Sequence, residues 1–323
     1  MCRYKIIPQL RPFRARRAVR WLGFLLAGLL ILHGSVLLAQ GSVPPVAAAE
    51  REVAARVGQR TIYADQVERE LRRVLRGRPI EAAAEAKLRT ETLQLLIDRQ
   101  KILSWLESKG QAATKTDLDR AIQQRETEVA KRRGTWEQYL RDLDLVDTED
   151  LREALRWQLS WRRFLDQYLT DENLERYFRE HRRDFDGTRL RVAHLRIPAR
   201  DDQPESWSAA KKQATDLLRQ IRSGMKTFDQ AAREASVAPT AAQGGELGWI
   251  ERHRPMVESF SQAAFALQPG QISEPVVTPF GVHLIHCLEV EPGQRSWRDA
   301  QSELETAVST FLFRWAAQRT TSP

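Results

Sequence analysis

The chain has 323 residues, of which 42% are hydrophobic and 29% are charged, and this composition is typical of a globular protein of about two domains. The formal net charge is +8, but seven basic residues and no acidic residue fall within residues 1–20. From Glu50 onward, 44 basic residues face 43 acidic ones. The body of the protein therefore lacks the basic excess that binds nucleic acid, and we expect no nucleic-acid partner.

An uncharged segment, residues 21–39, follows the basic tail formed by residues 1–20. Its length is close to the roughly 20 apolar residues of a membrane span, whereas His33, Gly34 and Ser35 favour the shorter core of a signal peptide, about 7–15 residues. The segment is thus either an uncleaved signal-anchor or a cleaved signal peptide. In both cases the tail stays in the cytoplasm and the body is exported. We expect a periplasmic protein, held at the inner membrane by residues 21–39 if the segment is retained.

Residues 40–52 are small, uncharged over most of their length and contain two prolines, which predicts a linker. Residues 53–186 begin with two short strands, at 53–57 and 61–62, and then follow a helical period. Cys2 precedes the apolar segment and Cys287 follows it. A disulfide between them would have to cross the membrane, so we expect none. The helices are predicted to begin near Asp65, to end at Gly110, to span 117–133 and 136–143, and to begin again at Thr148 and Thr170.

The pattern changes in residues 187–292, where strands and helices predict an α+β domain. In residues 293–323, the sequence Ser296-x-x-Asp299 predicts the start of a last helix. Its apolar stripe needs a partner groove, and the helical region 53–186 is the expected one. The elements expected in the α+β domain are strands at 191–197, 276–277 and 282–290, helices at 208–222, 227–235 and 257–267, and a loop at 237–248.

Three segments of the α+β region carry a family resemblance. They are Val192-Ala193-His194-Leu195, the stretch AAQGGELGW at 241–249, and the stretch VTPFGVHLI at 277–285. In this order and spacing, over about residues 189–291, the chain resembles parvulin-type peptidyl-prolyl cis-trans isomerases. Residues 53–186 are similar, more loosely, to the helical chaperone region of SurA-type and PrsA-type envelope foldases, whose C-terminal helix also returns to that region.

The resemblance implies a small antiparallel sheet with surrounding helices, joined to a mainly α-helical chaperone domain. Rotation about an X–Pro bond has a barrier of about 18–20 kcal/mol and needs no covalent step, so no cofactor or metal is expected. A dry pocket that grips the proline ring and polar groups that favour the twisted amide are sufficient. The resemblance implies His194 and His283 as the catalytic pair, with Leu247, Met256, Phe260, Thr278 and Phe280 as substrate-binding residues.

Each of these assignments has a structural alternative. The two histidines could be a hydrogen-bonded core pair that orders the sheet, because isomerisation needs no net proton transfer. Met256 and Phe260 are four residues apart at a helix start, which also fits ordinary core packing. Four tryptophans of the helical region could be core residues or part of a cradle for client proteins: Trp105, Trp136, Trp157 and Trp161.

One position departs from the family pattern. The family usually carries a cysteine or aspartate where this chain has Ala238. Residues 199–205 are net acidic, whereas phosphate-directed parvulins carry a basic cluster there, so we expect general X–Pro substrates. The predicted function is an envelope foldase that isomerises X–Pro bonds in unfolded exported polypeptides. The alternative is a catalytically weak or inactive parvulin-fold holdase or scaffold that binds unfolded clients.

Overall fold

The computed structural model describes residues 51–200 and 203–320. They belong to two compact units: the chain up to Thr170 together with the segment from Thr310 onward, and Asp171–Ser309. Helices and small antiparallel sheets give the predicted α+β class. The predicted tail 1–20 and the predicted membrane or signal segment 21–39 lie outside the described residues. Within the described part, no helix combines the length and the apolar character needed to cross a bilayer.

The N-terminal unit begins with a hairpin of two antiparallel strands, β1 (Val53–Val57) and β2 (Arg60–Tyr63). Its helices begin at residues that suit helix starts: the side chains of Thr114, Thr135 and Asp147 each accept a hydrogen bond from the backbone N–H three residues later. The helices are α1 (Ala64–Leu75), α2 (Ala82–Ser108), α3 (Lys115–Lys131), α4 (Trp136–Asp142) and α5 (Thr148–Leu165).

The C-terminal part of α11 (Gln301–Arg319) contributes aromatic rings to this unit. The Trp315 ring lies edge-on to Trp105 of α2, with centroids 5.8 Å apart, and the Phe313 ring lies edge-on to Trp161 of α5 at 5.8 Å. Trp105 also contacts the buried Phe164 at 5.6 Å. Edge-to-face pairs of this kind stabilise a core beyond their area alone. The last turns of α11 are therefore part of the core of the N-terminal unit.

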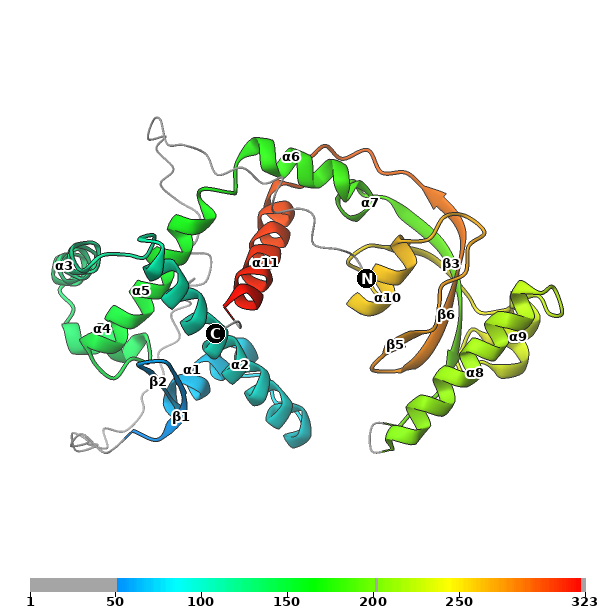
Figure 1. Cartoon of the computed structure of the whole chain (residues 1–323), viewed down its shortest axis with the longest axis horizontal. Coiled ribbons are helices and arrows are strands. Elements are labelled where there is room, and N and C mark those ends of the chain that lie inside the picture. Colours follow the sequence, from blue (N-terminus) through cyan, green and yellow to red (C-terminus); the bar gives the residue numbers. More distant parts are fainter. Residues whose placement is uncertain (1–50, 201–202, 321–323) are drawn as a thin grey trace. The chain divides into compact units, whose positions relative to one another are not determined.

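The second unit is built on a four-stranded antiparallel sheet in the order β4-β3-β6-β5. Figure 1 labels three of its strands, β3, β6 and β5. The long strands β3 (Arg189–Ile197) and β6 (Gly281–Glu291) form its centre, and β4 (Glu246–Glu251) and β5 (Val276–Thr278) form its edges. The helices of this unit are α6 (Asp171–Glu180), α7 (Arg182–Phe185), α8 (Pro204–Arg222), α9 (Phe228–Ala235) and α10 (Glu258–Phe265).

Alternation along β3 sorts its side chains between the two faces of the sheet. Leu195 and Ile197 pack under α8 and α9, together with Leu284 of β6. Leu190 and Val192 point to the other face, which α10 covers (Figure 1). His194 lies on this second face, where the ring of Phe260 of α10 contacts it. The face under α10 therefore holds His194 and Phe260, two of the residues that the family resemblance singles out.

The prediction of a loop across residues 237–248 is wrong at its end, because β4 begins at Glu246. Gly244, Gly245 and Gly248 all have left-handed φ values, and three such glycines in the sequence indicate a loop rather than a strand. The strand forms because it pairs with β3, in a register that includes Val192 opposite Gly248 and a bulge next to it. Tertiary pairing overrides the local preference here.

Candidate functional site

The two predicted catalytic histidines lie side by side on the central strands. His194 of β3 and His283 of β6 have their Nδ1 atoms 3.2 Å apart, and their rings stack with centroids at 5.4 Å and an angle of 24° between planes. A neutral imidazole has one donor and one acceptor nitrogen. The two rings can therefore share one hydrogen bond while both are uncharged, provided that one of the two Nδ1 atoms carries a proton.

Thr278, at the end of β5, fixes the other end of this pair. Its Oγ1 lies 2.9 Å from Nε2 of His283 and 3.4 Å from the carbonyl oxygen of Gly281, and it accepts a hydrogen bond from the N–H of Phe280 at 3.1 Å. The hydroxyl has one proton, and the shorter contact favours donation to Nε2. We infer from this network that His283 carries its proton on Nδ1 and donates it to Nδ1 of His194.

An aromatic ring from α10 covers the pair. The Phe260 ring lies edge-on to both imidazoles, with centroids 5.8 Å from His194 and 5.5 Å from His283. Phe260 is 2% exposed and belongs to the hydrophobic cluster of this face, against which Met256 and Leu247 pack as partly buried neighbours. The structure thus places His194, His283 and Phe260 in contact, and Met256 and Leu247 against the same cluster.

Phe280 differs from the other predicted site residues. Its backbone N–H is tied to Thr278, but its side chain is 60% exposed. The neighbouring Gly281 has a φ of +129°, and a Cβ there would lie 2.4 Å from the carbonyl oxygen of Ile197. Only glycine fits where the turn before β6 approaches β3 so closely. The turn therefore presents Phe280 to solvent beside the buried Thr278.

The Gly244-Gly245 motif brings β4 against the histidine strand. Gly245 has a φ of +83°, and a Cβ on it would lie 2.2 Å from the carbonyl oxygen of His194. Its own carbonyl accepts a hydrogen bond from the N–H of His194 at 2.8 Å. The second glycine is thus required by a close backbone contact at the histidine, which gives a physical reason for this motif.

Burial keeps the histidine pair uncharged. Loss of contact with water, together with a smaller effect from the charge of Arg196, lowers the pKa of His194 to about 4. Burial likewise lowers the pKa of His283 to about 4, with smaller effects from His194 and Arg196. Both imidazoles are therefore neutral near pH 7, as the shared hydrogen bond requires.

The loop after α9 contains Ala238, which is 5% exposed. Ser236 fixes this loop, because its Oγ accepts hydrogen bonds from the N–H groups of Arg196 at 3.0 Å and of Ala238 at 3.1 Å. The Arg196 side chain donates from Nη2 to the carbonyl oxygen of Val237 at 3.0 Å. Sequence analysis did not identify Arg196 or Ser236. The sequence does contain one signal for Arg196. It follows His194 by two residues on a strand whose side chains alternate between faces, so both side chains leave the strand on the same side.

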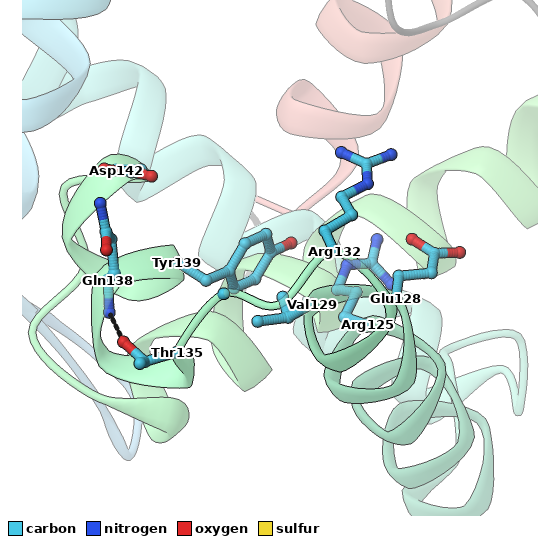
Figure 2. Close-up of a pocket in the computed structure, with 9 residues that line it drawn as sticks. Arg125, Glu128, Val129, Arg132, Thr135, Gln138, Tyr139 and Asp142 are labelled. Atoms are coloured by element: carbon cyan, nitrogen blue, oxygen red, sulfur yellow. Dashed lines mark hydrogen bonds between the residues drawn. The ribbon is translucent and has the colours of Figure 1, made fainter.

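A separate cavity of about 300 Å³ lies in the N-terminal unit, between α3 and α4. Figure 2 shows Tyr139 directed toward Val129, with Arg125, Glu128 and Arg132 on one side of them and Gln138 and Asp142 on the other. No predicted site residue lines it. Its charged groups are of both signs and, by themselves, indicate no ligand.

Comparison with known proteins gives two domain matches. Residues 194–289 match the PPIC-type PPIASE domain, and residues 11–165 match the SurA-like N-terminal domain. The first match covers both histidines and all five predicted substrate-binding residues.

Individual relatives agree with this division. The chain is 40% identical over 107 residues to "Peptidyl-prolyl cis-trans isomerase pin1" of Rhizopus delemar, covering 30% of this chain and 71% of that protein. It is 39% identical over 100 residues to "Foldase protein PrsA" of Bacillus subtilis, covering 31% of this chain and 33% of that protein. It is 45% identical over 126 residues to "Chaperone SurA" of Burkholderia mallei, covering 39% of this chain and 27% of that protein. The chain thus spans a third or less of these two bacterial relatives. It belongs to the PPIC-type peptidyl-prolyl isomerase family and carries a SurA-like N-terminal domain ahead of the isomerase domain.

Proposed function

We propose that this chain is an envelope foldase that isomerises X–Pro bonds in unfolded exported polypeptides. The observation that carries the proposal is the neutral pair of His194 and His283, bonded to Thr278 and covered by Phe260. A twisted X–Pro amide loses its conjugation, and a weakly polar, partly dehydrated surface stabilises it better than water does. The pair offers such a surface, because it carries no charge at neutral pH.

In this proposal the histidines shape the site and do not transfer protons. Their Nδ1 atoms are bonded to each other, and Nε2 of His283 is bonded to Thr278. Met256 and Leu247 would hold the proline ring beside Phe260, and Phe280 would contact the flanking chain from its exposed position. The roles of all seven residues are part of the proposal.

The location and the partners of the protein form the second part of the proposal. The basic tail 1–20 followed by the uncharged segment 21–39 supports an exported body, either anchored in the inner membrane or released from it. The SurA-like domain supports binding of unfolded clients in the envelope. A reporter enzyme fused after Pro323 should be active outside the cytoplasm, and cytoplasmic activity of the fusion would contradict this location.

One observation favours a second candidate function, a holdase with little isomerase activity. Ala238 places a buried methyl group where the family usually carries a cysteine or aspartate. Two assays on the full chain separate the candidates: exchange between cis and trans forms of a proline peptide, measured by NMR without a protease, and suppression of client aggregation, measured by light scattering. A foldase accelerates the cis-trans exchange and suppresses client aggregation. A chain that suppresses aggregation without accelerating the exchange would be a holdase.

A further inference from the structure

Arg196 brings a positive charge to the face of the sheet that holds the site. It follows His194 by two residues on β3, so the two side chains leave the strand on the same side. The strand register places Arg196 directly opposite His283 of β6. Side chains of directly opposite residues on antiparallel strands have Cβ atoms about 4.5–5.5 Å apart. Arg196 is therefore a neighbour of both histidines, and its residue is only partly buried.

The charge of Arg196 is not neutralised within the part of the chain that the structure describes. Its Nη2 donates to the neutral carbonyl of Val237, and its buried Nε has no hydrogen-bond partner there. The two other arginines of β3 differ: Arg189 pairs with Glu291, and Arg191 pairs with Glu246 and Glu289. Among the described residues, one strand thus carries two arginines that are paired with glutamates and a third whose guanidinium has only a backbone carbonyl for a partner.

The position of the guanidinium indicates which part of a substrate it would meet. The carbonyl that it binds belongs to Val237 and precedes Ala238, the position where the family usually carries a polar group near the reacting carbonyl. The reacting carbonyl of an X–Pro bond belongs to residue X. A guanidinium on this side of the pocket therefore faces the residue that precedes proline.

We propose that Arg196 selects for an acidic residue, aspartate or glutamate, immediately before the proline. The inference rests on the proposed isomerase function and adds a substrate class to it. A carboxylate in position X would offer the guanidinium a charged partner, and arginine suits this role because its planar group binds carboxylates through several donors. A lysine in position X would be repelled. The histidines do not compete for the carboxylate, because both are neutral.

The test uses the full chain and three peptides that differ only in residue X, which is glutamate, glutamine or lysine. Exchange between cis and trans forms is followed by NMR, without a coupled protease. We expect kcat/KM for the glutamate peptide to exceed that for the glutamine peptide by about fivefold, the size of one partly screened charge pair. The lysine peptide should be slower than the glutamine peptide. The ratio between glutamate and glutamine should approach one at about 1 M salt.

Variants of the arginine separate charge selection from a structural role. Arg196→Gln should bring the three peptides to equal rates, Arg196→Lys should keep the preference, and Arg196→Glu should favour the lysine peptide. A structural defect alone would slow all three peptides alike. Arg200→Gln is the matched control, because it removes an equal charge from an exposed residue beyond the end of β3 and should leave the ratios unchanged.

Two results would overturn the inference: equal rates for the three peptides in the unmodified chain, or a preference for the glutamate peptide that survives Arg196→Gln. If the chain accelerates the exchange of none of the three peptides, the proposed isomerase function is contradicted instead. In that case, binding of the same peptides, measured from NMR chemical-shift changes, tests the role of Arg196 independently of turnover. Tighter binding of the glutamate peptide that is lost in Arg196→Gln would support the inference without turnover.

Discussion

His194 and His283 share one hydrogen bond between Nδ1 atoms 3.2 Å apart, and each ring is neutral because burial holds its pKa at about 4. The pair therefore links protonation to the stability of the sheet. A proton added to one imidazole would have to displace the shared bond or leave a charge in a poorly hydrated site.

The first prediction is a loss of stability as the pH falls. In the unfolded chain both histidines take up protons near their ordinary pKa of 6.5, whereas in the folded protein they do so only near 4. The unfolded state thus binds more protons between these values, and the free energy of unfolding should fall through this window by up to about 1.4 kcal/mol per pH unit for each histidine. Above about pH 7.5, where the histidines of the unfolded chain are also neutral, the pair should make no contribution to the pH dependence.

Denaturant titrations at several pH values measure this effect. The carboxylates of the protein also titrate near the lower end of the window, so the informative quantity is the difference from a variant that combines His194→Asn with His283→Asn. That difference should shrink steadily from pH 6.5 to pH 4. A difference that does not change with pH would contradict the assigned pKa values.

The second prediction concerns Thr278, whose hydroxyl bonds Nε2 of His283 at 2.9 Å and accepts from the N–H of Phe280 at 3.1 Å. Thr278→Val keeps the shape and removes both bonds, so the free energy of unfolding should fall by about 1–3 kcal/mol. The His283 ring would also lose the group that fixes its proton on Nδ1. Isomerase activity should fall, and the ¹⁵N shifts of the His283 ring should show a mixture of tautomers.

Thr278→Ser is the matched control, because it retains the hydroxyl. It should keep the ¹⁵N pattern and most of the activity. Unchanged ring shifts in Thr278→Val would mean that another group sets the tautomer of His283.

The third prediction separates pocket residues from core residues on α10 and the segment before it. Phe260 is 2% exposed and contacts both histidine rings, so Phe260→Ala should cost about 3–5 kcal/mol and disturb the whole face. Met256 is only partly buried against the same cluster, so Met256→Ala should cost less. If Met256 holds the proline ring, its truncation should reduce isomerase activity at little cost in stability.

Melting curves, isomerisation rates and light scattering on each variant test this assignment. We expect Met256→Ala to keep its suppression of client aggregation, because we place client binding in the helical region with the last helix. A large loss of stability in Met256→Ala would identify Met256 as core. Loss of aggregation suppression by a folded variant would place client binding in the isomerase domain.

The face that holds the site could be predicted from the sequence because its signals are local. The alternation along 191–197 predicted a strand, and the three family segments pointed to His194, Thr278 and His283, which the structure brings together. The contact of Phe260 with both rings could not be predicted, because it depends on how α10 packs on the sheet. A spacing of four residues fits a pocket and a core equally well.

The limits of the two units depend on long-range hydrogen bonds. The sequence pattern changes after residue 186, whereas the compact second unit begins at Asp171. Asp186, just after α7, accepts from the N–H of Arg295 at 2.9 Å, and its side chain accepts from the N–H and the hydroxyl of Thr188. The bond from Arg295 ties the end of the α6–α7 segment to the chain that follows β6. Helical periodicity alone does not reveal which unit a helix joins.

The last prediction concerns Ala238, and Arg196 changes what a carboxylate there should do. Ala238→Asp would restore one of the side chains that the family usually carries. The new carboxylate would stand next to Val237, whose carbonyl oxygen binds the Arg196 guanidinium at 3.0 Å. The two charges should pair, because the guanidinium has no carboxylate partner within the described residues. Because the substitution restores a polar group near the reacting carbonyl, we expect activity toward neutral X–Pro peptides to rise. The rise is about tenfold for each 1.4 kcal/mol removed from the barrier.

The same substitution should remove the preference for glutamate before proline, since the guanidinium would be occupied. Rates for the glutamate and glutamine peptides should converge in Ala238→Asp. In a variant that also carries Arg196→Gln, the unpaired carboxylate should make the glutamate peptide the slower of the two. Ala238→Asn is the matched control, because it adds a polar side chain of the same size without the charge and should leave the glutamate preference in place. If Ala238→Asp folds but keeps both its original rate and its glutamate preference, position 238 does not face the reacting bond.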